Sequence, residues 1–242
     1  MDNPVIELLF KRKSVRVFTE KEISKEDKRL ILESASMAPT AGNQQLYTIL
    51  DIRDQDLKEA LAKTCDHQDF IAKAKLVLVF CADCKKWLDA YTLAGCKPRK
   101  PGVGDFLLAV NDALIAAQNA VIAAESLGIG SCYIGDIMEN YQEQKKLLEL
   151  PDFVFPATML VFGYPTEGQK LRQKPRRQRQ EDFVFENTYP RQRGQEIQEK
   201  FQYIAGKENY KEWLQKFCER KYHSDFSLEM TRSVQAFLDT LK

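Results

Sequence analysis

The feature that most constrains this sequence is a long, nearly uncharged segment at residues 106–128, FLLAVNDALIAAQNAVIAAESLG. Its pattern predicts one α-helix over 106–127, roughly 30 Å long at about 1.5 Å per residue. Asp112 and Glu125 are its only charged residues, so we expect most of its circumference to be buried. Polar residues within it, Asp112 and Asn119 among them, favour a buried helix of a soluble protein over a membrane span. The rest of the chain must supply elements that pack around this helix.

Strand patterns occur on both sides of this segment. The apolar run LVLVFCA at 76–82 is short enough for a β-strand that is buried on both faces. Residues that favour strands also dominate three other short segments, which predict strands at 46–52, 129–135 and 157–164.

Helical patterns complete the organisation. Asn3 and Ser24 are candidate N-caps of two helices near the N-terminus. Helical patterns recur from Ile197 onward. The sequence therefore predicts a mixed core over residues 1–190 and a helical C-terminal extension over 191–242.

The totals exclude several classes of protein. The chain has 242 residues and a formal net charge of +1, which argues against a general nucleic-acid or membrane binder. No basic start followed by an apolar run marks a secretory signal, so we expect a cytoplasmic protein. Its six cysteines are then expected to be free thiols.

Cations are concentrated in two short clusters. KRKSVRVF, at residues 11–18, places four cations around Ser14 where a predicted helix ends, and KLRQKPRRQR, at 170–179, has six cations and no acid. A phosphate needs several donors around one point, and a helix end with Ser, Lys and Arg supplies them. Two such clusters favour a shared anion site. A solvated basic loop, or a module that binds phosphate or nucleic acid through 170–179, is the alternative.

Common catalytic motifs are missing. The sequence has no P-loop or nucleophile elbow, and its only histidines are His67 and His223, so a serine or cysteine triad has few partners. CADC, at 81–84, could be a redox dithiol or half of a metal site. Because Cys81 lies in an apolar run, we expect it in the core, and we predict no metal site.

With these pieces in place, the chain resembles the nitroreductase family of flavoproteins, and within it the NADPH-dependent flavin oxidoreductase or oxygen-insensitive nitroreductase branch. RKSVRVF resembles the family's R-x-S-x-R-x-F element, and SASMAPTAGNQQLYTI resembles its A-P-S-x-x-N-x-Q segment. AAESLGIGSCYIGDI resembles the long helix that leads to Y-I-G, and QKPR resembles a K-P-R element of that branch. These four motifs occur in the family's order over about residues 5–190.

The resemblance implies bound FMN and names the residues that would hold it. Arg12, Ser14 and Arg16 would meet the phosphate and the adjoining flavin edge, and Lys174 and Arg176 would close on the phosphate from the other side. Residues that would contact or flank the isoalloxazine ring are Thr40, Asn43, Gln45, Gln68, Tyr133, Ile134, Gly135 and Asp136. The chemistry would occur at flavin N5, so no side-chain nucleophile is required.

The implied fold is α+β: a nitroreductase-like, mixed and mostly antiparallel sheet flanked by helices, in an intertwined homodimer with FMN at the subunit interface. The implied activity is ping-pong hydride transfer from NADPH (or NADH) through FMN to a nitroaromatic, a quinone or free flavin. The alternatives are a dehalogenase-like or flavin-fragmenting enzyme on the same scaffold, and the non-enzymatic module described above.

Two departures from the family pattern are visible. The family's Gln-Pro-Trp ending of the second motif is replaced here by Gln45-Leu46-Tyr47, which we expect to alter either the entry into the following strand or the wall of the pocket. The branch's arginine-rich segment for the NADPH 2′-phosphate has no clear match. The candidate substitutes are Arg220, Lys221 and the spare cations of the 170–179 loop.

Overall fold

The computed structural model describes residues 3–242. They form two compact units. The first holds the described residues up to Leu171 together with Glu229–Lys242, and the second is Arg172–Leu228. The division of the sequence at residue 190 stays a prediction, and the two units are described separately below.

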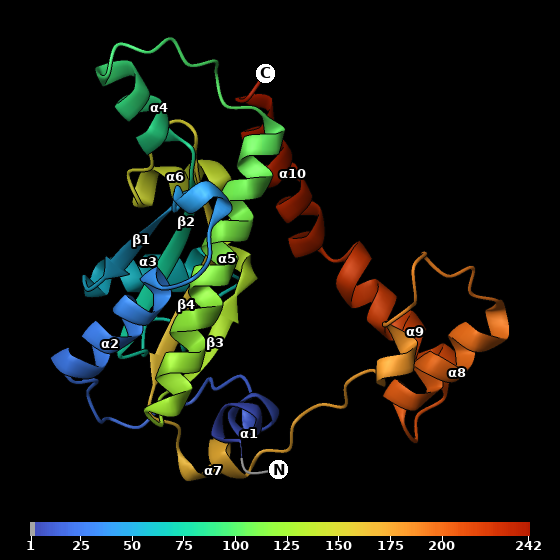
Figure 1. The fold of residues 1–242 in the computed structure, drawn as a ribbon. Helices are drawn as coiled ribbons and strands as arrows, with labels where there is room; N and C mark the ends of the chain where they lie inside the picture. Colours follow the sequence, from blue (N-terminus) through green and yellow to red (C-terminus); the bar gives the residue numbers. More distant parts are fainter. Residues whose placement is uncertain (1–2) are drawn as a thin grey trace. The chain divides into compact units, whose positions relative to one another are not determined.

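A four-stranded antiparallel sheet forms the centre of the first unit (Figure 1). Its spatial order is β1-β2-β4-β3. The strands are β1 (Tyr47–Ile52), β2 (Leu76–Asp83), β3 (Gly130–Ile134) and β4 (Val154–Gly163). A parallel bridge between Ser14 and Ser131 lies beside β3, so the prediction of a mixed, mostly antiparallel α+β fold is confirmed.

The apolar run of β2 explains why the sheet is covered on both faces. Successive side chains of a strand point to opposite faces, and Leu78 and Phe80 pack into one core while Val77 and Val79 pack into the other. All eight residues of β2 are buried. This confirms the predicted strand with two buried faces.

Helices cover the two faces of the sheet. On one face lie α2 (Lys25–Ser36) and the long helix α5 (Val103–Ser126), which crosses in front of the strands in Figure 1. The opposite core receives Leu61 from α3 (Gln55–Thr64) and Ile137 from η2 (Gly135–Met138). The remaining helical elements of this unit are α1 (Pro4–Lys11), η1 (Ala41–Asn43), α4 (Lys85–Leu93), α6 (Tyr141–Leu147), α7 (Glu167–Leu171) and, from Glu229 onward, α10 (Asp225–Asp239).

The predicted long helix exists, with one correction. Among residues 3–242, α5 is the one helix long and apolar enough to cross a membrane by length and composition, but its alanines pack against α2 and the sheet as a core helix. Its other side is exposed: Leu107 is 57% and Ile115 40% accessible. Burial of most of the helix circumference is therefore wrong for this single chain.

The second unit is helical, as its sequence pattern predicts. It contains η3 (Gln180–Asp182), α8 (Gly194–Ala205), α9 (Tyr210–Cys218) and a π-helical turn, η4 (Glu219–His223). The side chain of Asn209 caps α9 by accepting the N–H groups of Lys211 and Glu212.

Candidate cofactor site

The first cation cluster lies in an extended segment that runs along β3. The N–H of Val15 donates to the carbonyl of Ser131 at 2.9 Å, and the N–H of Thr19 donates to the carbonyl of Tyr164 at 2.8 Å. Since β3 is the last strand of the sheet, this segment covers its open edge.

Two glycines let this segment approach the sheet closely. A Cβ built on Gly130 would lie 2.5 Å from Cγ2 of Val15, and one built on Gly163 would lie 2.7 Å from the Phe18 ring. No larger residue fits at either position without movement. Because side chains alternate along extended chain, burying Val15 leaves Ser14 and Arg16 directed away from that contact.

The side chains of Arg12, Ser14 and Arg16 gather around the thiol of Cys132. Burial raises the pKa of this thiol, and Arg16, Ser14 and Arg12 all act in the opposite direction on it through charge or hydrogen bonds. The structure thus brings together the three residues that the sequence predicted, and their chemistry suits a phosphate ester.

The helix end beside this cluster is not the anion-binding kind. Arg12 is the C-cap of α1, and the C-terminal end of a helix carries partial negative charge. The expectation that a helix end helps to hold the anion is wrong here. Any attraction for an anion must therefore come from the cations of this segment and the Ser14 hydroxyl.

The segment that carries Thr40, Asn43 and Gln45 is strongly bent. Gly42, Asn43 and Gln45 all have positive φ, at 57°, 57° and 50°, and the N–H of Gln45 donates to Oγ1 of Thr40 at 3.2 Å. Backbone in this region is costly for residues other than glycine. The segment therefore needs an external contact to keep its shape.

Asp112 of α5 supplies that contact. Its Oδ1 accepts the N–H of Ala41 at 2.9 Å and its Oδ2 accepts the N–H of Leu46 at 3.0 Å, while the residue is only 3% exposed. We call this pair of bonds the Asp112 clasp. The sequence analysis did not predict this role, although an acid in the middle of an apolar helix signals a buried partner. Leu46 stands where the family pattern has proline, which has no N–H to donate.

Gln68 follows α3 in a tight turn. Asp66 and His67 have positive φ, the Gln68 N–H donates to the carbonyl of Ala62 at 2.9 Å, and its Nε2 donates to the carbonyl of Cys65 at 2.9 Å.

Gln68 shares a cavity with the first cation cluster. Gln68 and Arg16 line a hollow of about 790 Å³ together with Lys58, Lys73 and Lys75. Gln68 and Arg16 thus line the same cavity although more than fifty residues separate them in the sequence.

In the turn after β3, the space beside the backbone of Gly135 is open. The hydroxyl of Tyr133 donates to Oε1 of Gln118 at 3.2 Å, and burial raises its pKa to about 12, while nearby Arg12 opposes that shift. Ile134 packs in the core. A Cβ built on Gly135 would meet no atom within 4 Å. A planar ring could therefore approach the backbone at Gly135, beside Asp136, so these residues fit a flavin.

Lys174 and Arg176 lie in the second unit. There, Nη1 of Arg176 donates to the carbonyl of Tyr203 at 3.3 Å, and a Cβ on Gly206 would lie 3.2 Å from the same Nη1. Their approach to the Arg12–Arg16 segment remains a prediction.

CADC lies mainly in the core. Cys81 and Cys84 are both buried free thiols, and burial raises their pKa values to about 12 and about 11. Over residues 3–242, no group of three or more His, Cys, Asp or Glu side chains is arranged to hold a metal ion.

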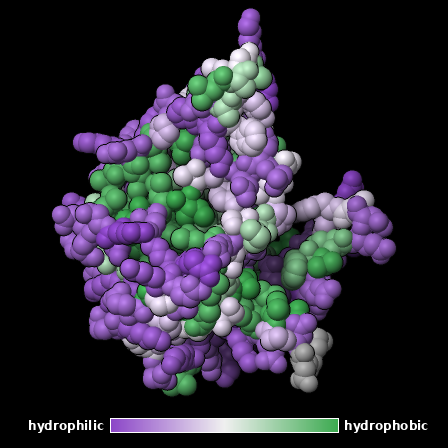
Figure 2. All heavy atoms as spheres, turned by 60° about the vertical axis from the view of Figure 1, so that its left-hand side comes forward, coloured by the Kyte–Doolittle hydropathy of each residue, from purple (hydrophilic) through white to green (hydrophobic). Residues whose placement is uncertain are grey.

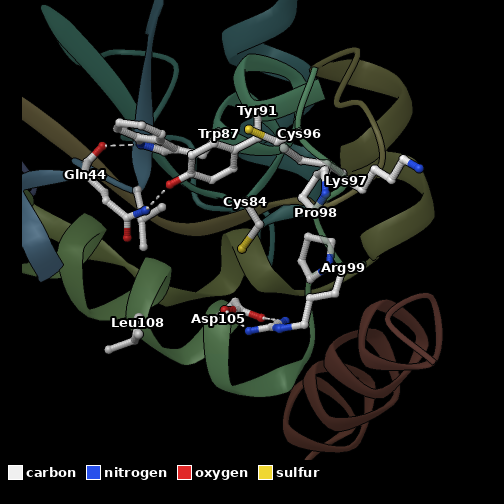
Figure 3. A pocket seen from close by; sticks show the side chains of 13 residues that line it. Gln44, Cys84, Trp87, Tyr91, Cys96, Lys97, Pro98, Arg99, Asp105 and Leu108 are labelled. Carbon is white, nitrogen blue, oxygen red and sulfur yellow. Dashed lines mark hydrogen bonds and ion pairs between the residues drawn. The ribbon is translucent and has the colours of Figure 1, made fainter. Parts of the chain in front are cut away.

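A second cavity, of about 390 Å³, lies between α4 and the start of α5 (Figure 3). Trp87 and Tyr91 line it, and the centroids of their rings lie 5.5 Å apart. Arg99 donates to both carboxylate oxygens of Asp105, at 2.5 and 2.9 Å. Gln44 fixes the rings: its carbonyl accepts the Trp87 indole N–H, and its amide donates to the Tyr91 hydroxyl. None of the predicted site residues lines this cavity.

Comparison with known proteins decides the family. The family model described as "Nitroreductase family" matches residues 9–164. The chain belongs to the nitroreductase family. This confirms the resemblance that the sequence motifs indicated, and with it the fold.

Two curated relatives match over most of their length. An FMN reductase (NAD(P)H) of Bacillus subtilis is 31% identical over 189 residues, which cover 77% of this chain and 75% of the relative. An oxygen-insensitive NADPH nitroreductase of Salmonella typhimurium is 36% identical over 188 residues, with the same coverage of each.

Solved structures match almost the whole chain. NfrA2 of B. megaterium superimposes with a TM-score of 0.85 at 28% identity, over 99% of this chain and 97% of the other. The NADPH:FMN oxidoreductase of Vibrio harveyi, solved with NAD+, gives a TM-score of 0.83 at 25% identity, over 98% of each.

Proposed function

We propose that the protein is an FMN-dependent oxidoreductase that passes electrons from NAD(P)H to small acceptors such as nitroaromatics, quinones or free flavin. The observation that carries this is the convergence of Arg12, Ser14 and Arg16 around Cys132, next to the open turn at Gly135. The names of the relatives, an FMN reductase and an NADPH nitroreductase, agree with it.

In this proposal, one set of site residues binds the FMN phosphate and another positions the flavin ring. Arg12, Ser14 and Arg16 bind the FMN phosphate, with Lys174 and Arg176 completing the charge around it. When bound, FMN accepts two electrons from the nicotinamide cosubstrate and gives them to the acceptor. The residues that position its ring are Thr40, Asn43, Gln45, Gln68, Tyr133, Ile134, Gly135 and Asp136.

The exposed apolar surface of the first unit supports a homodimer. Phe10 of α1 is 74% exposed, Met37 is 77% exposed, and Leu107 and Ile115 expose apolar surface on α5. Figure 2 shows hydrophobic residues reaching the surface between hydrophilic ones. Exposed apolar surface marks interaction sites, and we assign these side chains to the contact with a second copy of the chain in the cytoplasm. Analytical ultracentrifugation should give twice the chain mass of 27.9 kDa; a monomer would refute the assignment.

The purified protein provides the first test of the activity. We expect a yellow protein with flavin absorption bands that bleach when NADPH is added, and turnover with a nitroaromatic acceptor. A colourless protein that binds oligonucleotides in a salt-sensitive way would instead support the nucleic-acid module. A flavoprotein without nitroaromatic turnover would support another enzyme on this scaffold.

Arg16→Ala tests the phosphate site directly. Because a charge-assisted hydrogen bond contributes about 1.5–3 kcal/mol, we expect FMN to dissociate at least about tenfold more readily. Arg53→Ala is the matched control, because Arg53 is exposed and its guanidinium forms an ion pair with Asp51 at 2.5 Å. Equal FMN retention by wild type and Arg16→Ala would refute the assigned role of Arg16.

A further inference from the structure

Glu139 is an unusually placed acid. It follows η2 directly and is only 4% exposed. Its Oε1 is buried and has no hydrogen-bond partner among residues 3–242. An ionised carboxylate in such a place is expensive unless it is paired. The position therefore needs a compensating cation or a proton.

Acids surround Glu139 from several elements. After burial, the charges of Asp136 in η2 and Asp66 in the turn after α3, a side-chain hydrogen bond with Asp136, and the charge of Glu229 in α10 all raise the pKa of Glu139. The thiol of Cys65, at the end of α3, is also close, and burial raises its pKa, with Asp136 and Glu139 adding to that effect. Within residues 3–242, these acids and the thiol are not arranged to hold a metal ion.

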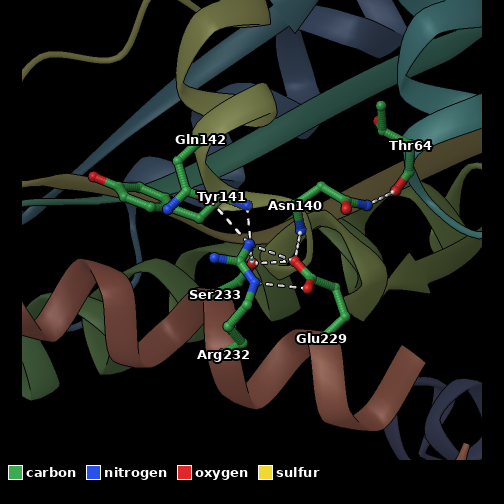
Figure 4. Close-up of polar contacts among 7 residues, drawn as sticks. All are labelled: Thr64, Asn140, Tyr141, Gln142, Glu229, Arg232 and Ser233. Carbon is green, nitrogen blue, oxygen red and sulfur yellow. Dashed lines mark hydrogen bonds and ion pairs between the residues drawn. The ribbon is translucent and has the colours of Figure 1, made fainter. Parts of the chain in front are cut away.

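The nearest arginine on α10 is already committed to another acid (Figure 4). Arg232 binds both oxygens of Glu229 at 2.7 Å, and Glu229 also accepts the Ser233 hydroxyl at 2.8 Å and the Asn140 N–H at 3.0 Å. These bonds, led by that of Arg232, lower the pKa of Glu229 to about 2. Glu229 thus stays ionised, and Arg232 pairs with it.

We propose that Glu139 is a positioning residue that carries a proton at neutral pH and donates it in a hydrogen bond to Asp136, so that the two carboxyl groups share one proton and hold the turn at Gly135–Met138 closed. The backbone closes the same turn, since the Glu139 N–H donates to the Asp136 carbonyl at 3.0 Å. Burial, followed by the charges of Asp136 and Asp66, raises the pKa of Glu139 to about 8, in agreement with this geometry.

The proton matters because of where the turn lies. This step rests on the proposed function, which places Gly135 and Asp136 against the flavin. With the proton in place, the pair carries one negative charge; without it, two charges repel each other at the turn. FMN should therefore bind less tightly above about pH 8 in the wild type, while Glu139→Gln, which keeps a hydrogen-bond donor and no charge, should bind FMN with little pH dependence.

Unfolding of the full-length protein tests the proton itself. A carboxyl group that is protonated when folded and ionised when unfolded makes the unfolding constant rise about tenfold per pH unit between its unfolded and folded pKa values. Between pH 5.5 and 7.5, the unfolding constant of the wild type should therefore rise about 100-fold more than that of Glu139→Gln. Glu143→Gln, on the exposed side of α6, is the control and should follow the wild type.

The outcomes separate this proposal from the proposed function. Parallel pH profiles for wild type and Glu139→Gln would overturn the shared proton even if the protein is yellow and oxidises NADPH. Divergent profiles in a protein that neither binds FMN nor oxidises NADPH would retain the shared proton and overturn only the function. If Glu139→Gln does not fold, potentiometric titration of the wild type and Asp136→Asn decides: a proton that the wild type releases near pH 8 and Asp136→Asn releases at lower pH supports the proposal, and identical titration curves overturn it.

Discussion

Replacing Asp112 by asparagine tests how the segment from Thr40 to Leu46 is held. Asp112 accepts two backbone N–H groups, from Ala41 at 2.9 Å and Leu46 at 3.0 Å. Asparagine has nearly the same shape, but only one of its two terminal groups can accept a hydrogen bond. Its NH₂ group would face one of the two backbone donors, so the clasp would lose one bond and gain a buried donor without a partner.

The size of the effect follows from these contacts. A hydrogen bond to a charged group contributes about 1.5–3 kcal/mol, and the neutral amide recovers part of this because it is cheaper to bury than a carboxylate. We expect Asp112→Asn to lower the free energy of unfolding by about 2 kcal/mol. Because the clasp shapes the segment with Thr40, Asn43 and Gln45, the dissociation constant of FMN should also rise by about tenfold.

Two measurements and one control check this prediction. Chemical denaturation gives the free energy of unfolding, and quenching of flavin fluorescence on titration with protein gives the dissociation constant. Asp56→Asn makes the same chemical change at an exposed position in the first turn of α3 and should alter both values little. If Asp112→Asn unfolds and binds FMN like the wild type, the clasp does not organise the segment.

Two further predictions concern packing and charge. Gly163→Ala would place a Cβ 2.7 Å from the Phe18 ring, which should lower the free energy of unfolding by about 1–3 kcal/mol. Adding Phe18→Leu should restore part of the lost stability, and thermal denaturation of both variants would show whether it does. Glu229 has a pKa lowered to about 2 by Arg232 first and then by Ser233 and the Asn140 N–H, so its stabilising effect is present at neutral pH and is lost as the pH falls from about 4.5 toward 2. Glu229→Gln should therefore be less stable than the wild type at pH 7 and equally stable near pH 2 by denaturant unfolding, and an unchanged difference across this range would contradict the assignment.

The sequence predicted the local elements because their signals are local. Ser24 accepts the N–H of Asp27 at 2.9 Å as the predicted N-cap of α2, and Asn3 caps α1 in the same way. The predicted long helix starts three residues early, at Val103, because the carboxylate of Asp105 accepts the N–H of Gly102 at 2.8 Å. That cap lay outside the apolar pattern, so periodicity alone did not reveal it.

The candidate site also contains residues that the sequence predicted and one that it did not. The motifs predicted Arg12, Ser14, Arg16 and Gln68 as members of one site, and the structure brings these four residues to one region of the first unit. They did not reveal Asp112, whose role depends on contacts with residues 66 and 71 positions away. A polar side chain in an apolar helix signals a partner but does not say which one.

By itself, the amino-acid sequence determined which segments become helices and strands and which family the chain belongs to. These follow from hydrophobic spacing, capping residues and short motifs, all of which act over a few neighbouring residues. Only the tertiary structure decided that Gly130 and Gly163 admit the Val15–Phe18 segment, that Asp112 holds the segment from Thr40 to Leu46, and that Glu139 is buried. The physical reason is that burial and pairing depend on which faces meet when distant segments pack, and no local pattern specifies that meeting.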